Sequence, residues 1–402
     1  MSRKSRMAAV QSPIIPVIGK LVQETPEAIS LGQGVVFYPP PPEIYPAIER
    51  AISDPAIHRY QEVQGLIPLR RLLWRKLQRE NQLPLQGIHQ VVVTAGSNMG
   101  FMNAILAITE PGDDILLLTP YYFNHEMAVR MAGCHPRLVA TDENYQPSLA
   151  AIVAALTPKT RAIVTISPNN PTGMVYAPQT LQAINQLCQE RGLYHISDEA
   201  YEYFIYGDRP HCSPGCFDES YRHTISLFSL SKSYGFAGWR IGYMAIPAAL
   251  QSAMQKIQDT LLICPTVLAQ CAALAALQVG RSYPQSHLPA LRRVRQTVLA
   301  QLATLGDGCQ LGQPDGAFYV LARIPETVWP GQQPHQVMAL VKTLIRQYGV
   351  AVIPGFAFGQ TSGCTLRIAY GALAPDTVSQ GIDRLVTGLR SLSASPPSYP
   401  RD

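Results

Sequence analysis

Short apolar runs of strand type recur along residues 91–228, and each run ends in a polar or glycine-rich motif. Helical patterns separate most of these runs, for example over residues 100–108 and 180–190. Strands that alternate with helices predict an α/β fold with a mostly parallel sheet. The five runs are Val91 to Val93, Ile115 to Leu118, Ala162 to Ile166, Leu193 to Ile196 and Thr224 to Phe228.

The motifs that follow these runs are expected to meet in one crevice. In an open α/β sheet, ligands bind outside the carboxyl ends of the parallel strands. All five motifs would therefore contribute to a single site. They begin at Thr94, Pro120, Ser167, Asp198 and Ser229.

The pattern changes after Tyr243, where the chain becomes helical from Pro247 to about Val279 and again from about Pro289 to Leu305. A smaller alternation of strands and helices follows over residues 316–370. We predict a large domain of residues 45–284 and a small domain built from residues 1–44 and 285–402. We expect the Ser/Pro-rich tail from about Ser391 to be disordered.

Composition excludes several classes of protein. A net charge of +5 over 402 residues is slight, and no dense Lys/Arg run with interleaved aromatic residues argues for a nucleic-acid partner. No stretch has the ~18 consecutive apolar residues of a membrane span, and no signal-peptide pattern opens the chain. We therefore expect a cytoplasmic protein without nucleic-acid or membrane partners.

The eight cysteines form no disulfide framework in a chain of this length. His211, Cys212 and Cys216 resemble metal ligands in type, but they lack a second matched pair and Pro214 indicates a turn between them. We expect no metal site.

Two cations stand out in the segment from Ser229 to Arg240. Lys232 and Arg240 lie eight residues apart with no acidic residue near them. Burying both charges is costly unless each has a partner or the lysine is neutral. A bound anion together with covalent use of the amine would resolve both costs. The alternative is that both are ordinary surface or structural charges.

The pattern Ser-x-Ser-Lys at 229–232, with Gly238 and Arg240 after it, resembles the lysine signature of the class I/II aminotransferases, which are fold-type I enzymes like aspartate aminotransferase. The resemblance covers about residues 30–375. It implies a large domain with a mostly parallel seven-stranded sheet flanked by helices, a smaller α/β domain, and a homodimer with shared active sites. It also implies the cofactor pyridoxal 5'-phosphate.

The resemblance assigns the catalytic roles to three residues. Lys232 would bind the cofactor aldehyde and, once released by substrate, move a proton as general base and acid. Asp198 would pair with the pyridine nitrogen, although an aspartate after a strand is as often a helix N-cap. Tyr201, in the family's Asp-x-Ala-Tyr, would bond the phenolic oxygen.

The remaining cofactor contacts are also implied by the resemblance. The helix opening at Gly96, Ser97 and Asn98 would present backbone amides to the phosphate. The resemblance further implies that Ser229 and Arg240 contact the phosphate and that Asn170 contacts the phenolic oxygen. Tyr122, or its neighbour Tyr121, would lie on the ring face. Tyr60 would contact the phosphate of the neighbouring subunit.

Substrate contacts are expected from two ends of the chain. Arg367 lies in an apolar run, where it would bind the substrate α-carboxylate or else belong to a buried ion pair. The glycine- and proline-rich loop over 31–42 would border the substrate side chain through Gly34 and Tyr38, and Asn170 would also touch the substrate. Val36 and Phe37 replace the usual Pro and Asp of this loop, which favours an apolar pocket.

We therefore expect a ping-pong aminotransferase acting on an amino acid and a 2-oxo acid. Asn98 stands where some relatives that favour dicarboxylic substrates carry a lysine, so neutral or aromatic amino acids are favoured. The alternatives are a C–S lyase or an ACC-synthase-like lyase of the same fold. A regulator built on this fold would need an N-terminal DNA-binding module, for which we expect no room before residue 31.

Overall fold

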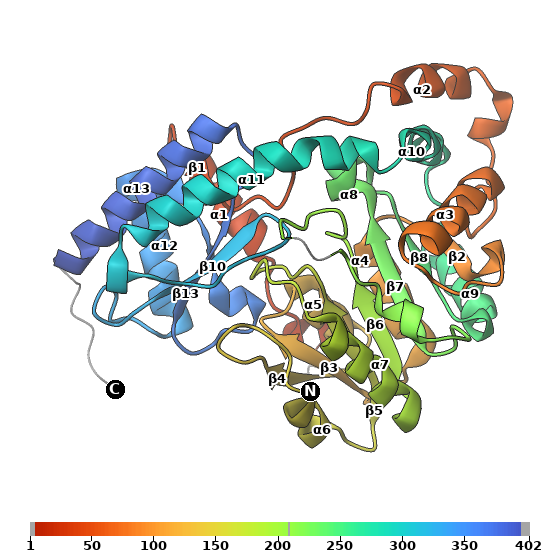
Figure 1. The fold of residues 1–402 in the computed structure, drawn as a ribbon, viewed down its shortest axis with the longest axis horizontal. Coiled ribbons are helices and arrows are strands. Elements are labelled where there is room, and N and C mark those ends of the chain that lie inside the picture. Colours follow the sequence, from red (N-terminus) through yellow and green to blue (C-terminus); the bar gives the residue numbers. More distant parts are fainter. Residues whose placement is uncertain (1–4, 208–209, 395–402) are drawn as a thin grey trace.

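A seven-stranded sheet forms the centre of the larger part of the molecule (Figure 1). The structure is a computed structural model, and it describes residues 5–207 and 210–394. The strands lie in the order β2-β8-β7-β6-β5-β3-β4. Their bounds are β2 (Val91–Thr94), β3 (Asp114–Thr119), β4 (His135–Ala140), β5 (Thr160–Ile166), β6 (Tyr194–Asp198), β7 (Thr224–Ser229) and β8 (Gly242–Ala245).

The five strands expected from the sequence run in the same direction. β3 to β7 pair in parallel, whereas β8 is antiparallel to both β7 and β2, so β2 runs the same way as β7. Gly242 faces Ser229 on one side and Thr94 on the other. A Cβ at Gly242 would lie only 2.8 Å from the backbone nitrogen of Ser97. This glycine therefore lets the motifs after β2 and β7 lie side by side.

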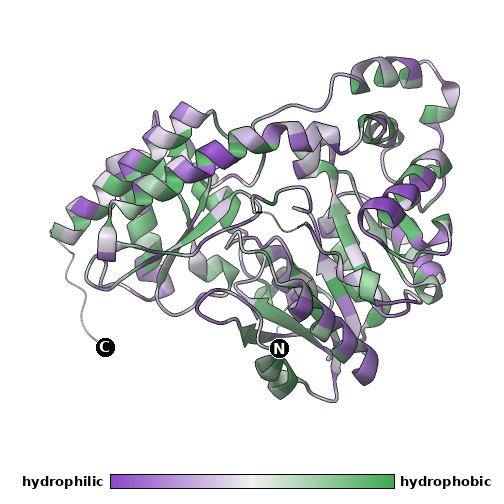
Figure 2. Cartoon of the chain, viewed as in Figure 1, coloured by the Kyte–Doolittle hydropathy of each residue, from purple (hydrophilic) through white to green (hydrophobic). Residues whose placement is uncertain are grey.

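Both faces of the sheet are buried, which explains why its strands read as continuous apolar runs. Neighbouring side chains point to opposite faces. Leu117 of β3 packs in the core cluster that contains Phe101 of α4, whereas Leu116 packs in the cluster that contains Leu181 and Ile184 of α7. Figure 2 shows the apolar sheet between helices with polar outer faces. The helices of this part are α2 (Ile44–Ile52), α3 (Ile67–Glu80), α4 (Ser97–Ile108), α5 (Phe123–Met131), α6 (Leu149–Ala155), α7 (Pro178–Arg191), α8 (Leu230–Ser233), α9 (Gln251–Leu262) and α10 (Val267–Val279).

A smaller antiparallel sheet of order β12-β13-β10-β9 lies in the part drawn in blue at the left of Figure 1. Beside it, β1 pairs in parallel with β11, which brings the N-terminal segment against the C-terminal part. The domain boundaries at 44/45 and 284/285 stay a prediction. The elements here are α1 (Ile14–Gln23), β1 (Ile29–Ser30), α11 (Ser282–Ala303), β9 (Gln310–Leu311), β10 (Tyr319–Ile324), α12 (Pro334–Tyr348), β11 (Val350–Ala351), β12 (Ile353–Pro354), β13 (Cys364–Ala369) and α13 (Pro375–Ala394).

Three sequence-based expectations about helices are wrong in detail. The helical region from 247 is two helices, because Ile263 has a left-handed φ of 67° and Pro265 follows it. α11 begins at Ser282 and continues through Pro289. Residues 391–394 belong to α13, while 395–402 lie outside the described residues. Within the described ranges, no helix combines the length and the apolar character needed to cross a membrane.

Candidate active site

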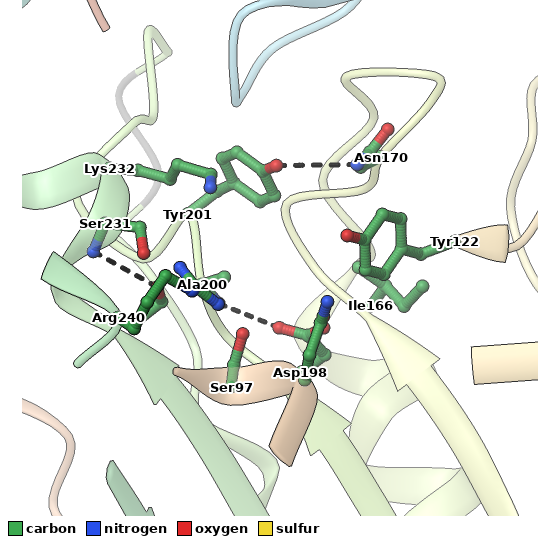
Figure 3. Close-up of a pocket in the computed structure, with 12 residues that line it drawn as sticks. Ser97, Tyr122, Ile166, Asn170, Asp198, Ala200, Tyr201, Ser231, Lys232 and Arg240 are labelled. Atoms are coloured by element: carbon green, nitrogen blue, oxygen red, sulfur yellow. Dashed lines mark hydrogen bonds between the residues drawn. The ribbon is translucent and has the colours of Figure 1, made fainter. Parts of the chain in front are cut away.

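A cavity opens at the carboxyl ends of β5, β6 and β7 (Figure 3). Most of the residues predicted to contact a cofactor line it. Gly96 and Tyr60 are the two predicted cofactor contacts that are not among the lining residues. The lining residues are Ser97, Asn98, Tyr122, Ile166, Asn170, Asp198, Ala200, Tyr201, Ser229, Ser231, Lys232 and Arg240.

Lys232 projects into this cavity from α8, the short helix that directly follows β7. Ser229 caps this helix, because its hydroxyl accepts a hydrogen bond of 3.2 Å from the backbone N–H of Ser231. No described residue forms a hydrogen bond with Nζ of Lys232. Burial lowers the pKa of Lys232 to about 8; Arg240 and Arg367 add to this effect and Asp198 opposes it. A partly neutral amine without a partner suits nucleophilic or base chemistry.

Asp198 ends β6 with both carboxylate oxygens held in place. Oδ1 accepts a 3.1 Å hydrogen bond from the N–H of Ala200, which holds the carboxylate in a turn. Residues 199–204 form no helix, so the expected alternative of a helix N-cap is wrong. Oδ2 lies 3.1 Å from Nε2 of His125, whose ring stacks on Phe101 at 4.0 Å. The sequence reasoning missed His125. Its only signal is its position three residues after Tyr122, the residue that caps α5, in whose first turn His125 lies.

Tyr201, Asn170 and Arg367 form a connected chain at the other side of the cavity. Nδ2 of Asn170 donates to the Tyr201 hydroxyl at 3.4 Å, and Nη1 of Arg367 donates to Oδ1 of Asn170 at 3.1 Å. The oxygen of the Asn170 amide is thus occupied by Arg367, so the NH₂ group must face Tyr201. Nη2 of Arg367 donates to the carbonyl of Gly32 at 2.6 Å.

Arg367 is a buried cation whose hydrogen-bond partners are neutral. Only 2% of it is exposed, and burial lowers its pKa. The alternative of a buried ion pair is not realised, because no carboxylate of residues 5–207 or 210–394 lies within ion-pair distance. A buried cation without a counter-ion favours an anionic ligand.

A second anion-binding arrangement lies at the start of α4. Gly96 precedes this helix with a φ of 81°, and a Cβ there would lie 2.5 Å from Nη2 of Arg240. Glycine is therefore needed both for the backbone conformation and for the close approach of the guanidinium. Arg240 is itself fixed by a 2.8 Å hydrogen bond from Nη1 to the carbonyl of Ala237. The first backbone amides of α4 and the guanidinium thus form a cradle for an anion.

Besides Gly96 and Arg367, which border the cavity, four further residues predicted for the site or offered as alternatives lie outside its lining. Tyr60 is 81% exposed on the surface, and Tyr121 packs against Gly359. Tyr38 lies behind Lys232, where its hydroxyl donates to the Lys232 carbonyl at 3.0 Å and its ring stacks on His287 at 3.8 Å. A Cβ at Gly34 would lie 2.5 Å from the Tyr319 hydroxyl. Tyr38 and Gly34 thus border residues of the site rather than the cavity itself.

The residues present fit pyridoxal phosphate. The cavity contains an amine without a partner among the described residues, a buried carboxylate and an anion cradle that a Cβ at position 96 would fill. The order of the sheet and this cavity define the fold-type I class of α/β enzymes. A family model described as "Aminotransferase class I and II" matches residues 26–385.

Comparisons with known proteins give the same family. The chain is 32% identical over 395 residues to "Aromatic aminotransferase ISS1" of Arabidopsis thaliana, covering 96% of each protein. It is 33% identical to the "Probable aspartate/prephenate aminotransferase" of Aquifex aeolicus, covering 91% and 92%. A solved aspartate aminotransferase from Thermus thermophilus with maleate has a TM-score of 0.87 at 30% identity and covers 96% of this chain and 100% of its own.

The chain therefore belongs to the class I and II aminotransferases, a family that depends on pyridoxal phosphate, and it is a transaminase. The lyase alternatives are not favoured.

Proposed function

We propose that this protein binds pyridoxal phosphate in the cavity and transfers an amino group, in ping-pong order, between a neutral or aromatic amino acid and a 2-oxo acid. The observation that carries the proposal is the pair of unneutralised cations. In the part of the chain that the structure describes, Lys232 offers an amine without a hydrogen-bond partner, and Arg367 offers a guanidinium without a carboxylate. Each needs a ligand that residues 5–207 and 210–394 do not supply.

Each residue has a role that its position supports. When bound, the cofactor ring supplies an electron sink for the electron pair released at the substrate Cα. Lys232 would hold the cofactor aldehyde and would carry the proton that leaves the substrate Cα. Asp198, fixed by His125, keeps the ring nitrogen protonated. Tyr201 and Asn170 donate to the phenolic oxygen.

The phosphate and the ring face would be held by the opposite end of the cavity. The amides of Gly96, Ser97 and Asn98 and the side chains of Ser229 and Arg240 would bind the phosphate. Tyr122 would lie against the ring. Its hydroxyl accepts a 2.9 Å hydrogen bond from Nδ2 of Asn124, which fixes its orientation.

The preference for neutral or aromatic substrates rests on the cations available. Arg367 would bind the α-carboxylate of every substrate. Lys232 and Arg240 are the only cations among the residues that line the described cavity, and both have cofactor roles in this proposal. Asn98 offers no charge to a second carboxylate. The relative named as an aromatic aminotransferase supports the same preference.

The proposal includes a homodimer with shared sites. Tyr60 is 81% exposed in the single chain, and nearby Tyr45 and Ile52 are 52% and 54% exposed. A second copy would cover these side chains and bring Tyr60 to its phosphate. A cytoplasmic location stays a prediction.

A panel of half-reactions tests the proposed function. Protein loaded with pyridoxal phosphate is mixed with one amino acid at a time, and loss of the visible absorption band is followed. We expect Phe, Tyr, Met and Gln to react faster than Asp. Continuous release of ammonia or pyruvate without a 2-oxo acid would instead indicate a lyase, and a failure to take up the cofactor would refute the proposal.

Arg367→Ala is the matched variant for this panel. It removes the cation expected to bind every α-carboxylate, so KM for amino acids should rise about 10²-fold. The dissociation constant for pyridoxal phosphate should change by less than about threefold. Equal loss of both affinities would remove the carboxylate role from Arg367.

A further inference from the structure

Tyr319 is a buried residue that contacts both Tyr201 and Arg367 but does not itself line the cavity. It begins β10 and is 0% exposed. Its hydroxyl lies 2.7 Å from the Tyr201 hydroxyl, and either oxygen could be the donor. The rings of the two tyrosines meet edge to face with centroids 5.5 Å apart. Nothing in the sequence pattern marked this tyrosine as a functional residue.

The ring of Tyr319 also covers the substrate-binding arginine. The guanidinium carbon of Arg367 lies 4.8 Å from the centre of this ring. β10 and β13 are antiparallel, and Leu321 faces Arg367 in their register. Tyr319, two residues before Leu321, is therefore the diagonal neighbour of Arg367 on the same face. A cation over an aromatic face gains electrostatic energy that increases when water is excluded.

The hydroxyl contact has a direction that follows from counting protons. A tyrosine hydroxyl carries one hydrogen and can accept through its oxygen. Once Tyr201 donates its hydrogen to a cofactor oxygen, Tyr319 can only donate to Tyr201. Such a donation strengthens the hydrogen bond that Tyr201 makes in turn, because linked hydrogen bonds polarise one another.

The position of the Tyr319 hydroxyl is restricted by the loop over residues 31–42, which contains Gly34. A Cβ at Gly34 would approach this hydroxyl to 2.5 Å, so residue 34 must be glycine for the tyrosine pair to form. This contact gives a physical reason for the glycine that the sequence analysis placed near the substrate.

We propose that Tyr319 is a positioning residue with two separable functions. Its hydroxyl directs the Tyr201 proton toward the phenolic oxygen of the cofactor, and its ring holds Arg367 for the substrate carboxylate. The inference rests on the proposed function, since it assigns partners to the same cavity. It predicts that removing the hydroxyl and removing the ring have different consequences.

Tyr319→Phe tests the hydroxyl through the spectrum of the bound cofactor. A weaker donor at Tyr201 leaves more negative charge on the phenolic oxygen, which holds the neighbouring proton more tightly. The midpoint pH of the visible band should therefore rise by roughly half a pH unit. Tyr201→Phe should raise it further, and adding Tyr319→Phe to Tyr201→Phe should change nothing, because Tyr319 acts through Tyr201.

The matched control is Tyr206→Phe. Tyr206 is also buried, and its hydroxyl donates to the carbonyl of Ala317, two residues from Tyr319, without lining the cavity. Its loss should leave the midpoint unchanged. The charged and titratable groups around the tyrosine pair stay the same in all these variants, so differences report the hydroxyl. These groups are Tyr122, Asp198, Lys232, Arg240 and Arg367.

Tyr319→Leu tests the ring. Tyr319→Phe keeps the aromatic face and should change KM for the amino acid less than about twofold. Tyr319→Leu removes it and should raise KM about five- to thirtyfold. Should Tyr319→Phe not fold, Gly34→Ala provides a second route, since its methyl group displaces the hydroxyl and should raise the midpoint in the same direction.

Two outcomes separate this inference from the proposed function. A protein that takes up no pyridoxal phosphate would refute both. A loaded protein whose midpoint responds to Tyr201→Phe but not to Tyr319→Phe would overturn the positioning role alone. The positioning role would also be overturned if Tyr319→Phe shifted the midpoint pH equally in the wild-type protein and in the Tyr201→Phe variant. Tyr319 would then act independently of Tyr201.

Discussion

Two lysines near the ends of the central strands have opposite surroundings. Nζ of Lys76, on α3, lies 2.6 Å from Oε1 of Glu202 and 2.8 Å from Oδ1 of Asn81. Its ammonium group also lies over the ring of Phe228, 4.8 Å from the centroid. Lys232 has no hydrogen-bond partner among the described residues. One lysine is neutralised by the chain itself, whereas the other is left for a ligand.

The side chains in the turn that begins at Asp198 divide in the same way between those that line the cavity and those that are paired within the chain. Asp198 and Tyr201 line the cavity, whereas Glu199 points into a polar network in which it accepts hydrogen bonds from His211, at 2.7 Å, and Ser213. Glu202, next in this turn, belongs to the Lys76 pair. Networks with satisfied partners act on stability, and an isolated perturbed charge in a cleft indicates function. The difference between the two lysines therefore separates structural from functional charge.

The largest effect on stability is expected at the satisfied lysine. Lys76→Met leaves Glu202 as a buried carboxylate without its cation, since the two side chains are only 7% and 10% exposed. The free energy of unfolding should fall by about 3–5 kcal/mol. Urea denaturation of the cofactor-free protein measures this loss. Amino-transfer activity of the folded fraction should stay within a fewfold of wild type. A specific loss of activity would contradict the assignment of Lys76 to stability alone.

The same substitution at the other lysine should have the opposite sign. Folding depresses the pKa of Lys232 to about 8, so below that pH the native state contains a charge that is costly to bury. Lys232→Met removes this cost and should raise the free energy of unfolding of the cofactor-free protein by about 3 kcal/mol at pH 7. Transfer activity should fall by about 10⁴-fold.

The stability difference between wild type and Lys232→Met should depend on pH. Between pH 8 and the unfolded pKa of about 10.5, the unfolded chain retains the Lys232 proton that the native state has released, so wild-type stability rises with pH. The advantage of Lys232→Met should therefore shrink across this window. The tyrosines and cysteines of the chain titrate equally in wild type and in Lys232→Met, so their contributions cancel in the difference between the two free energies of unfolding. An advantage that is constant with pH would contradict the lowered pKa.

The sequence predicted the parts of the site that are local in the chain. The lysine signature, the motif at Asp198 and the glycine before α4 each lie within a few residues, and parallel strands bring them together. Contacts between distant segments left no such pattern. Tyr201 and Tyr319 are 118 residues apart, and the support of Lys232 by Tyr38 spans 194. Which side chains meet in such pairs depends on how segments far apart in the chain pack together, and no local pattern shows this.

The misjudged helix boundaries have a similar cause. Ile263 adopts a positive φ that β-branched residues rarely take, so its part in ending α9 has no sequence pattern. Pro265, three residues after the end of α9, was the one local signal for this break. Pro289 was expected near a helix start, but it lies inside α11. Packing of that long helix against α13 outweighs the local preference of proline.

The smallest expected effect concerns how fast protein prepared without cofactor takes up pyridoxal phosphate. The Lys232 amine can attack an aldehyde carbon only when it is neutral. With a pKa of about 8, its neutral fraction falls about tenfold for each pH unit below 8 and is nearly constant above 9. The second-order rate of appearance of the visible band should follow this curve between pH 6.5 and 9.5. The second ionisation of a phosphate, near pH 6, lies below this range.

A variant of Arg240 provides the sharpest control for the rate of cofactor uptake. Arg240 is the second cause, after burial, of the lowered pKa of Lys232. Arg240→Gln should therefore move the midpoint of the uptake curve upward, whereas Lys76→Met, outside the cavity, should leave it near pH 8. A lysine in water keeps gaining reactivity up to its pKa of about 10.4, and a wild-type curve that still rises at pH 9.5 would show that Lys232 behaves in the same way. The contrast between the two lysines would then be one of hydrogen-bond partners alone, without the electrostatic difference that prepares Lys232 for its ligand.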